Sequence, residues 1–436
     1  MRSRRQRGSV FVMSLAVLAG LIAVLASVMA SQHTAIQAQI GRQDRARARR
    51  AAESGIQRAL AELVNVQAAN PDAANQPDPT TSGSAATGNA VTLQDSWAQL
   101  GQNGDERFAL GRESFRLQIV DAAARININS SPQEQLERLP LSQEQIESLL
   151  DFREAGRDPR AQGGKDEFYG NLSEPYNAKL RPFDAVDELL QVRGWTADVL
   201  FRPVEDVASN TPLPQDAAGR TVPLYDLLTT SSYSPQVDPA GQARINVNTG
   251  NQQQRAQRLL QAGFSQQASA IITARNNWAS IGEIAAATGL TPEDQQRVLD
   301  YLAVNGQPRI AGLMNINTAS EELLSTVPGI TPDIAQAIVQ RQGQGFASLG
   351  ELATIPGVTA QVLQQAAGSL TTISQSFIVR VIGLAGESTV ALEAIVDVAD
   401  GQPRLRQILE VPYTNVETRW GWAEDTTTET ILREGS

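Results

Sequence analysis

The sequence predicts an α+β fold in which a long N-terminal helix packs on an antiparallel sheet, and a large all-α insertion interrupts the strands of that sheet. Three observations lead to this prediction. An apolar run and a helical pattern continue through residues 9–66, alternating apolar residues recur at 108–119 and 377–409, and a helical segment repeats three times between them. Neither strand group is large enough for a stable sheet alone, so we expect the two groups to pair with each other.

Composition limits the chemistry of this chain of 436 residues. It contains no cysteine, which excludes disulfides, thiol catalysis and thiolate metal sites, and its single histidine, His33, lies on the predicted N-terminal helix. No nucleophile elbow, phosphate-binding loop or pattern of metal-binding histidines is present, so we do not expect an enzyme. The formal net charge is −11, and loss of four arginines near the N-terminus would make it −15, a balance that opposes binding to phosphate backbones.

The N-terminal segment has the length and charge pattern of a membrane anchor. Residues 10–30 form a charge-free apolar run, which as a helix would be about 30 Å long, the thickness of a hydrocarbon layer. Arginines precede the run at positions 2, 4, 5 and 7, so the leader should stay cytoplasmic and the large remainder should be exported. A signal peptide cleaved after Ala30 and an uncleaved anchor are two interpretations, and the apolar run is long for the first.

A third interpretation depends on Gly8, which lies at the boundary between the basic leader and the apolar run. This boundary resembles the leader of type IV prepilins, in which a prepilin peptidase cuts after the glycine and methylates the new N-terminal residue, here Ser9. Pilin-like subunits usually carry a glutamate at the fifth mature position, but here that residue is Met13. Because a buried amine without a carboxylate partner is costly in lipid, Met13 should prevent docking beneath another subunit of the same kind.

The remainder of the chain divides by pattern into further segments. In the second half of the long helix, Ala52, Ile56, Ala59 and Leu63 form one apolar stripe, and arginines cover much of the remaining surface, either solvated or in contact with a headgroup or partner. Residues 65–94 are rich in Pro, Gly, Ser and Asn, which is typical of a surface loop. The predicted organisation is a leader (1–8), a transmembrane and stalk helix (9–66), a loop with the first strands (67–129), a helical insertion (130–375), C-terminal strands (376–412) and a tail (413–436).

The insertion contains an internal repeat, which we call units 1, 2 and 3, at residues 130–202, 245–304 and 314–375, with a connector at 203–244. Each unit is opened by an Asn-x-Asn motif, and the hydroxyl residue after it, Ser130, Thr249 or Thr318, fits a capping box for a first helix. Later in each unit come an aromatic residue, an acidic position, and a glycine turn followed by a threonine that should cap another helix. The aromatic residues are Phe183, Trp278 and Phe346, and the threonines are Thr196, Thr291 and Thr359. Each unit is therefore predicted to be two short helical hairpins.

Such units resemble the helix-hairpin-helix family, and Val327-Pro328-Gly329-Ile330-Thr331 in unit 3 is the closest match. In that family a Gly-x-Gly turn binds DNA phosphates with help from nearby Lys or Arg. Here Thr331 and Ser265 replace the second glycine in units 3 and 2, although Arg275 and Arg341 remain nearby. The acidic balance of the chain favours a scaffold for protein packing over DNA binding, and we expect no nucleic-acid partner.

Unit 1 is interrupted between residues 153 and 182 by sequences that resemble the K-type minor pseudopilins of type II secretion systems. The matching runs are Gly163-Gly164-Lys165-Asp166-Glu167-Phe168-Tyr169, Pro175-Tyr176-Asn177-Ala178-Lys179-Leu180-Arg181-Pro182-Phe183 and Val186-Asp187-Glu188-Leu189-Leu190-Gln191-Val192-Arg193-Gly194-Trp195-Thr196. Members of that family typically lack the glutamate that Met13 replaces and are thought to cap the pseudopilus tip.

The resemblance implies a pilin-like sheet and a single-pass protein of the inner membrane, with its C-terminal bulk in the periplasm. It implies as partners the minor pseudopilins of the I, J and H types, the major pseudopilin and prepilin peptidase, in a machine that exports proteins across the outer membrane. Two alternatives remain: a membrane-anchored helix-hairpin-helix protein of DNA uptake, and a minor pilin of a type IV pilus.

Some members of this family bind calcium in the helical insertion. Calcium needs six to eight oxygen ligands, usually from several carboxylates and carbonyls on a flexible loop. Asp158, Asp166 and Glu167 lie in such a Gly- and Pro-rich loop, so they are the candidate calcium ligands, although no spaced loop of the EF-hand kind is present. A solvated acidic loop without a metal is the alternative.

Overall fold

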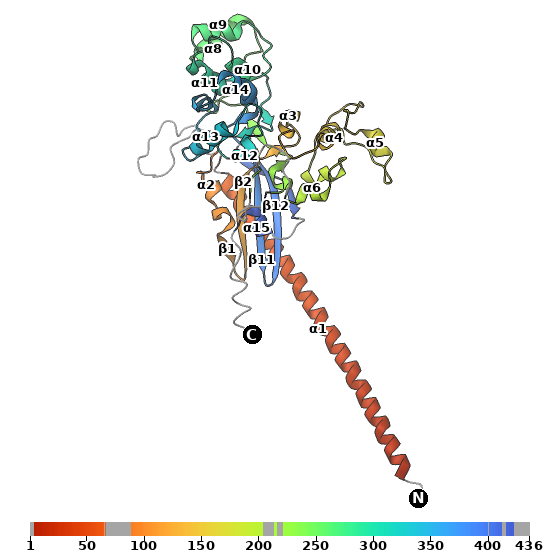
Figure 1. Ribbon diagram of the computed structural model, residues 1–436. Coiled ribbons are helices and arrows are strands. Elements are labelled where there is room, and N and C mark those ends of the chain that lie inside the picture. Colours follow the sequence, from red (N-terminus) through yellow and green to blue (C-terminus); the bar gives the residue numbers. More distant parts are fainter. Residues whose placement is uncertain are drawn as a thin grey trace.

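The computed structural model describes residues 4–64, 66, 89–203, 213–215, 221–399, 401–411 and 416–422 (Figure 1). The loop predicted at 65–94, the connector at 203–244 and the tail at 413–436 lie partly outside these residues, as do the first three residues of the leader. In the described part, the long helix α1 (Arg4–Leu63) projects from a sheet, and the helical region lies at the end of that sheet away from the N-terminus (Figure 1).

The sheet has five antiparallel strands in the order β1-β2-β11-β12-β13. The strands are β1 (Arg107–Leu110), β2 (Glu113–Asp121), β11 (Ser376–Ala385), β12 (Ser388–Ala399) and β13 (Gln402–Glu410). Strand β2 pairs directly with β11, with Phe377 opposite Asp121, although more than half of the chain lies between them in sequence. The predicted pairing of the two distant strand groups is therefore confirmed.

The C-terminal half of α1 covers one face of this sheet. The predicted stripe of Ala52, Ile56, Ala59 and Leu63 is buried there against apolar side chains of β2, β11 and β12. Helix and sheet approach closely at Gly383, where an added Cβ would lie 2.0 Å from the carbonyl oxygen of Ala48. Small residues on both surfaces thus allow the backbone of α1 to lie directly on β11.

The opposite face of the sheet is covered near β11 by the segment that follows β13. The short helix α15 (Val416–Trp420) places Trp420 and Trp422 against Ile382, and both indole rings are almost fully buried. The guanidinium carbon of Arg116 lies 5.2 Å from the centroid of the Trp422 ring. Nε1 of Trp422 donates a hydrogen bond to Oε1 of Gln118. Both faces of the central strands are therefore buried.

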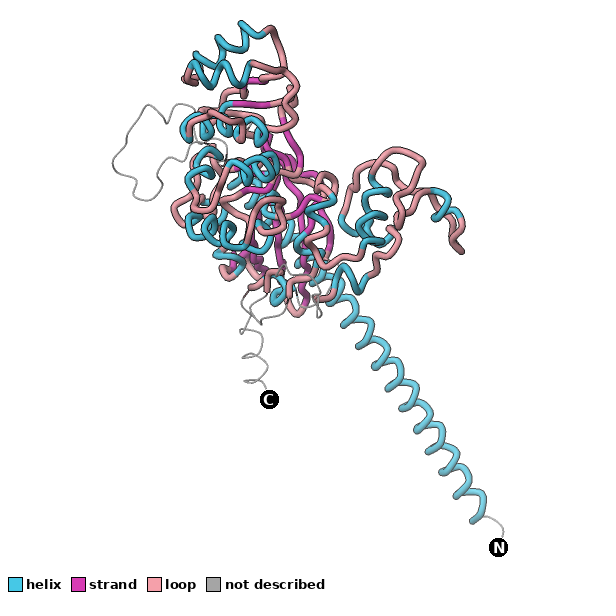
Figure 2. The backbone as a smooth tube through the Cα atoms, turned by 45° about the horizontal axis from the view of Figure 1, so that its top comes forward, coloured by secondary structure: helices cyan, strands magenta, loops and turns pink. Residues whose placement is uncertain are grey.

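The insertion consists of short helices and short strands (Figure 2), and the strands have two or three residues each. Between β2 and unit 2 the elements are η3 (Ala122–Ala124), β3 (Ile126–Asn127), α3 (Gln133–Leu136), α4 (Gln143–Arg153), α5 (Asp166–Gly170), η4 (Val186–Gln191), α6 (Ala197–Phe201), α7 (Leu224–Leu227), β4 (Leu228–Thr229) and β5 (Tyr233–Pro235). Unit 2 comprises β6 (Ile245–Asn246), α8 (Gln252–Gln261), α9 (Gln266–Thr273), α10 (Ile281–Ala285), α11 (Pro292–Tyr301) and β7 (Leu302–Ala303). Strand β8 (Arg309–Ala311) precedes unit 3, which comprises β9 (Met314–Asn315), α12 (Glu321–Leu324), α13 (Pro332–Gln342), η5 (Leu349–Thr354), α14 (Ala360–Ala366), η6 (Ala367–Ser369) and β10 (Leu370–Thr371). Before β1 lie α2 (Ser96–Gln99) and η2 (Gln102–Gly104).

Each unit is closed by a parallel pair of two-residue strands. The Asn-x-Asn motif supplies the first strand, and a segment after the second hairpin supplies the other, giving the pairs β3·β4, β6·β7 and β9·β10. The partner strand of unit 1, Leu228–Thr229, lies within the predicted connector. Strands β5 and β8 pair antiparallel and join the segments before units 2 and 3. One continuous hydrophobic core runs through all three units.

The helix caps agree with the sequence prediction in the second hairpin of each unit but not in the first. Thr196, Thr291 and Thr359 each accept a backbone N–H and cap α6, α11 and α14. The caps predicted at Ser130, Thr249 and Thr318 are wrong, because the first helices begin two residues later, after Pro132, Asn251 and Ser320. The two threonines donate instead to earlier residues: Thr249 Oγ1 to the carbonyl of Asn246, and Thr318 Oγ1 to Asp121.

Candidate functional site

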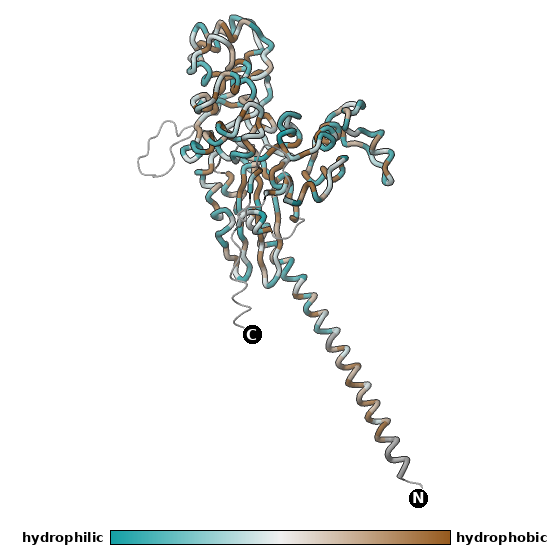
Figure 3. Tube along the Cα trace, viewed as in Figure 1, coloured by the Kyte–Doolittle hydropathy of each residue, from teal (hydrophilic) through white to brown (hydrophobic). Residues whose placement is uncertain are grey.

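The N-terminal half of α1 exposes apolar side chains along its length and carries the predicted processing residues. Gly8 and Ser9 lie within this continuous helix, and Met13 is 72% exposed. Within the described part of the chain, α1 is the one helix long and apolar enough to cross a membrane, and its apolar window has no contact with the body of the protein (Figure 3). No acidic residue occurs between Ser9 and Asp44 in the sequence. The exposed stretch of α1 therefore presents an apolar surface without a carboxylate.

The arginines that follow the apolar stretch hold α1 against the edge of the sheet. Arg45 and Arg49 contact the carboxylate of Glu410 at the end of β13, with N···O distances of 2.5 and 3.0 Å. Exposed ion pairs contribute little free energy individually, but two on one carboxylate fix the rotation of the helix relative to the strand. Part of the predicted basic surface thus has a partner inside the chain.

The second asparagine of each Asn-x-Asn motif binds the backbone of the aromatic residue in the second hairpin. In unit 3 the Oδ1 of Asn317 accepts the N–H of Phe346 at 2.7 Å, and its Nδ2 donates to the carbonyl of the same residue at 3.0 Å. Asn248 makes the same pair of hydrogen bonds with Trp278 in unit 2, and Asn129 does so with Phe183 in unit 1. The motif is therefore a clamp that joins the two hairpins of each unit.

Each unit also contains an ion pair around its aromatic residue. A cationic side chain a few residues before the aromatic residue contacts the glutamate that lies five residues after the aromatic residue. In unit 2 Arg275 contacts Glu283, and its guanidinium lies 3.6 Å from the ring centroid of Trp278. In unit 3 Arg341 likewise contacts Glu351 and lies over Phe346. Lys179 and Glu188 are the corresponding pair in unit 1. The arginines that DNA binding would need are thus already bound to carboxylates, which opposes their use as phosphate ligands.

The turns that resemble DNA-binding hairpins use their hydroxyl residues as helix caps. Gly329 and Gly263 adopt the left-handed conformation expected of the first glycine, with φ of 88° and 83°. Thr331 then caps α13, and Ser265 caps α9 by accepting the N–H of Ala268 at 3.0 Å. Side-chain hydroxyls of the protein therefore already bind some of the backbone N–H groups that follow these turns, which leaves fewer of them for a phosphate.

The candidate calcium ligands are not gathered into one site. Asp166 Oδ1 accepts the backbone N–H of Ala178 at 2.8 Å, and Asp158 and Glu167 are exposed. Within the described residues, no group of three acidic or histidine side chains is positioned to hold a metal ion. Lys165, which precedes Asp166 in the chain, is buried and donates to the carbonyls of Asp151 and Glu154 at the end of α4. The residues present therefore do not fit a calcium site in this arrangement.

A buried polar junction that the sequence analysis did not identify connects the sheet to unit 3. Asp121, at the end of β2, accepts hydrogen bonds at one carboxylate oxygen from Asn315 Nδ2, Thr318 Oγ1 and Ser374 Oγ, at 2.7–2.8 Å. Its other oxygen accepts the N–H of Ala123. Burial raises the pKa of this carboxyl group, although the four hydrogen bonds act in the opposite direction. This junction fixes the direction in which the insertion leaves the sheet.

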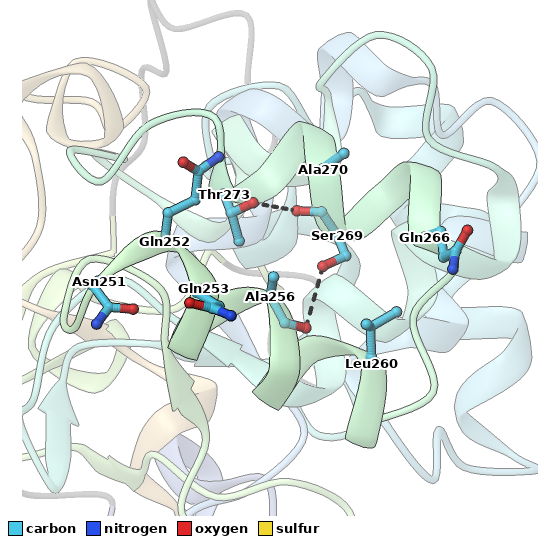
Figure 4. Close-up of a pocket in the computed structure, with 9 residues that line it drawn as sticks. All are labelled: Asn251, Gln252, Gln253, Ala256, Leu260, Gln266, Ser269, Ala270 and Thr273. Atoms are coloured by element: carbon cyan, nitrogen blue, oxygen red, sulfur yellow. Dashed lines mark hydrogen bonds between the residues drawn. The ribbon is translucent and has the colours of Figure 1, made fainter.

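The end of the insertion farthest from the free end of α1 carries an uncharged groove of about 640 Å³ between α8 and α9 (Figures 1 and 4). Its hydroxyl groups are satisfied internally, since Ser269 Oγ donates to the carbonyl of Ala256 and Thr273 Oγ1 donates to that of Ser269. The groove offers contact surface but no reactive group. Its lining residues are Asn251, Gln252, Gln253, Ala256, Leu260, Gln266, Ser269, Ala270 and Thr273.

Comparison with known proteins adds matches over parts of the chain. Residues 121–202 match the family described as "Type II secretion system (T2SS), protein K", and residues 311–371 match the helix-hairpin-helix motif. A stretch of 54 residues is 46% identical to the endonuclease/exonuclease/phosphatase family domain-containing protein 1 of Xenopus laevis; it covers 12% of this chain and 10% of that protein. The crystal structure of the GspK-GspI-GspJ complex from the type 2 secretion system of enterotoxigenic Escherichia coli aligns with a TM-score of 0.49 and 14% identity, over 86% of this chain and 99% of that one.

An apolar N-terminal helix that continues into a stalk and packs on an antiparallel sheet defines a membrane-anchored subunit of the pilin-like class. Over residues 121–202, which include the end of β2 and most of unit 1, the chain matches the protein K family of the type II secretion system. The match indicates that the chain is a structural component of that machine. It is anchored in the inner membrane by α1, with the sheet and the insertion in the periplasm.

Proposed function

We propose that this chain is the minor pseudopilin that caps the tip of the type II secretion pseudopilus. The observation that carries the proposal is the absence of a carboxylate along the exposed part of α1, with Met13 where pilin-like subunits have a glutamate. In a filament, the N-terminal amine of one subunit needs a carboxylate from its neighbour, because an unpaired charge is costly in an apolar core. A subunit without that carboxylate cannot accept the amine of an identical neighbour and so serves at the end of the filament.

The position of the insertion supports the same placement. The helical units lie at the end of the sheet away from the free end of α1, where a subunit stacked above would have to pass (Figure 1). At the tip this space is open. The insertion then becomes the most distal surface of the filament, and its packed helical units form a scaffold rather than a nucleic-acid site.

Assembly would begin with processing at Gly8. Prepilin peptidase would hydrolyse the peptide bond between Gly8 and Ser9 and methylate the new amine of Ser9, which removes the leader (1–8) and frees α1 to leave the bilayer. The complex in the structure from Escherichia coli contains GspK, GspI and GspJ. By analogy, the partners of this chain would be minor pseudopilins of the I, J and H types, joined to the major pseudopilin.

Intact-mass and N-terminal peptide mass spectrometry on protein recovered from membranes tests the processing step. In cells with prepilin peptidase we expect loss of residues 1–8 and one methyl group on Ser9, and in cells without it an uncut chain. Cleavage after Ala30, or an uncut leader in both strains, would show that α1 is not a pilin-like stalk.

Co-purification from detergent-solubilised membranes tests the tip assignment and distinguishes it from the type IV pilus alternative. Recovery of I- and J-type pseudopilins supports the tip role, whereas recovery of the major pilin of a type IV pilus supports the pilus alternative. For the DNA-uptake alternative, duplex binding would have to exceed that of an equally acidic control protein and fall in Arg275→Gln and Arg341→Gln. The ion pairs of both arginines lead us to expect no such binding.

Calcium binding to the loop of Asp158, Asp166 and Glu167 is a separate proposal that rests on the resemblance alone. Calorimetric titration of the full chain with CaCl₂, with MgCl₂ as the control, tests it. Calcium binding is supported if CaCl₂ but not MgCl₂ gives a heat of binding, and if this heat is lost in Asp166→Asn. Such binding would require the three residues to come closer together than they do here.

A further inference from the structure

A partly open cavity of about 200 Å³ lies between units 2 and 3, and its lining includes one arginine, Arg244. Its walls come from the start of α10, from β7, and from η6 and β10, with Ile281, Leu302 and Leu370 as the apolar lining. The cavity is smaller than the roughly 300–1,000 Å³ of pockets for drug-sized ligands, so it fits a small molecule or a single side chain.

The guanidinium of Arg244 is incompletely paired. Its Nε donates to the carbonyl of Val237 at 2.8 Å, and among the described residues no hydrogen-bond or ion-pair partner is present for its two terminal nitrogens. Burial lowers the pKa of Arg244, and Asp300 and Asp238 act on it only from beyond ion-pair distance. The partner that best stabilises the charged guanidinium in such a site is a carboxylate that accepts two parallel hydrogen bonds.

The two nearby acids are committed to other bonds. The carboxylate of Asp300 accepts the N–H of Gly350 at 2.7 Å and the hydroxyl of Ser348 at 2.9 Å, which ties α11 to η5. Asp238 Oδ1 accepts the N–H groups of Ala240 and Gln242 within a turn. Neither carboxylate can move to Arg244 without breaking these bonds.

The internal repeat supplies a comparison for this arginine. Arg125 and Arg244 stand at the same position, two residues before the first asparagine of the Asn-x-Asn motifs of units 1 and 2. Arg125 is buried and forms an ion pair with Glu393 of β12, with an N···O distance of 3.9 Å. Unit 2 lies away from the five-stranded sheet (Figure 1), and among the described residues no carboxylate forms an ion pair with Arg244.

We propose that the cavity at Arg244 binds a carboxylate supplied from outside the chain, carried on a short apolar stem that lies against Ile281, Leu302 and Leu370. The guanidinium recognises the carboxylate through its two terminal nitrogens, and the size of the cavity restricts the stem to a few carbons. A small free dicarboxylate and the side chain of a glutamate in another polypeptide both have this chemistry. The site is independent of the tip assignment and would persist if that assignment failed.

Calorimetric titration of the full chain in detergent micelles tests the site with two probes. One is glutarate, and the other is acetyl-Ala-Glu-Ala-amide, whose sole carboxylate is the glutamate side chain. Saturable binding of either probe, with no binding of acetyl-Ala-Gln-Ala-amide, supports the site, and which probe binds identifies the source. In Arg244→Gln, Kd should rise at least about tenfold because a charge-assisted pair is lost. Arg275→Gln, in the same unit and already paired with Glu283, should bind as the wild type does.

Three outcomes would overturn the proposal: binding of neither probe, equal binding of the glutamine peptide, or unchanged binding in Arg244→Gln. A second variant covers the case in which Arg244→Gln does not fold. Gly368→Val adds a side chain at the opposite wall, where a Cβ would lie 3.6 Å from that of Ser280, and leaves Arg244 intact. It should reduce binding by filling the cavity, and wild-type affinity in this variant would also contradict the proposal.

Discussion

The asparagine clamp of unit 3 gives the sharpest test of how the insertion is held together. Asn317 and Phe346 are both fully buried, and the side chain of Asn317 satisfies both backbone groups of Phe346. Asn317→Ala removes the two bonds and leaves a buried N–H and a buried carbonyl without partners. We expect the two hairpins of unit 3 to separate more easily, while the sheet and α1 stay folded.

The magnitude follows from the number of groups left unsatisfied. Each buried polar group without a partner costs about 1–3 kcal/mol, so the two groups should lower the free energy of opening of unit 3 by about 2–6 kcal/mol. At about 1.4 kcal/mol per factor of ten, amide exchange in unit 3 should accelerate roughly 30- to 20,000-fold. The N–H of Phe346 donates directly to Asn317 and should show the largest change.

Hydrogen–deuterium exchange on the full chain in detergent micelles, read by mass spectrometry, measures this change. Asn248→Ala is the matched control, because Asn248 makes the same bonds to Trp278 in unit 2 but is only half-buried, so that water can replace it. We expect a smaller acceleration there, confined to unit 2. An Asn317→Ala chain with wild-type exchange, or a larger effect from Asn248→Ala, would refute the view that burial of these bonds determines the strength of the clamp.

Three further changes test other contacts. Gly282→Ala would place a Cβ 2.3 Å from the carbonyl oxygen of Leu363, so we expect a loss of about 1–3 kcal/mol in thermal unfolding, whereas Gly343→Ala, which meets nothing within 4 Å, should have little effect. Because burial raises the pKa of Asp121, its contribution to stability is present at low pH and lost as pH rises; relative to Asp121→Asn, the wild type should therefore lose unfolding free energy above about pH 4, as thermal melts across pH would show. Trp422→Ala removes a buried ring, and we expect faster amide exchange in α15 with β2 and β11 still protected.

The elements that the sequence predicts correctly are those with a local signal. The stripe on α1 and the alternation in β2, β11, β12 and β13 reflect burial of one face, which a periodic pattern records. The caps at Thr196, Thr291 and Thr359 follow a glycine turn, and there the local hydrogen bond decides where the helix begins.

The parts that the sequence does not predict depend on distant partners. The first caps of the units were misplaced because the hydroxyls of Thr249 and Thr318 bond to other groups, and a pattern of four residues cannot show that competition. The two-residue strands are too short for any periodicity, and β3 pairs with a segment around residue 228. The side chains that donate to Asp121 lie 194 to 253 residues away, so only the repeated asparagines could have pointed to this part of the structure.

The three units share one hydrophobic core but differ in how closely their second hairpins pack on a neighbouring unit. Gly282 and Gly350 occupy the same position in units 2 and 3, and each allows its hairpin to lie directly on the partner unit: an added Cβ at Gly350 would lie 2.5 Å from Asp300 Oδ2. In unit 1 this position is Asp187, whose side chain excludes such close contact. Units 2 and 3 therefore pack on each other through α10·α14 and α11·η5, while α4, α5 and α6 of unit 1 form a separate lobe (Figure 1). The aspartate at this position is thus one difference between unit 1 and the two units that pack closely on each other.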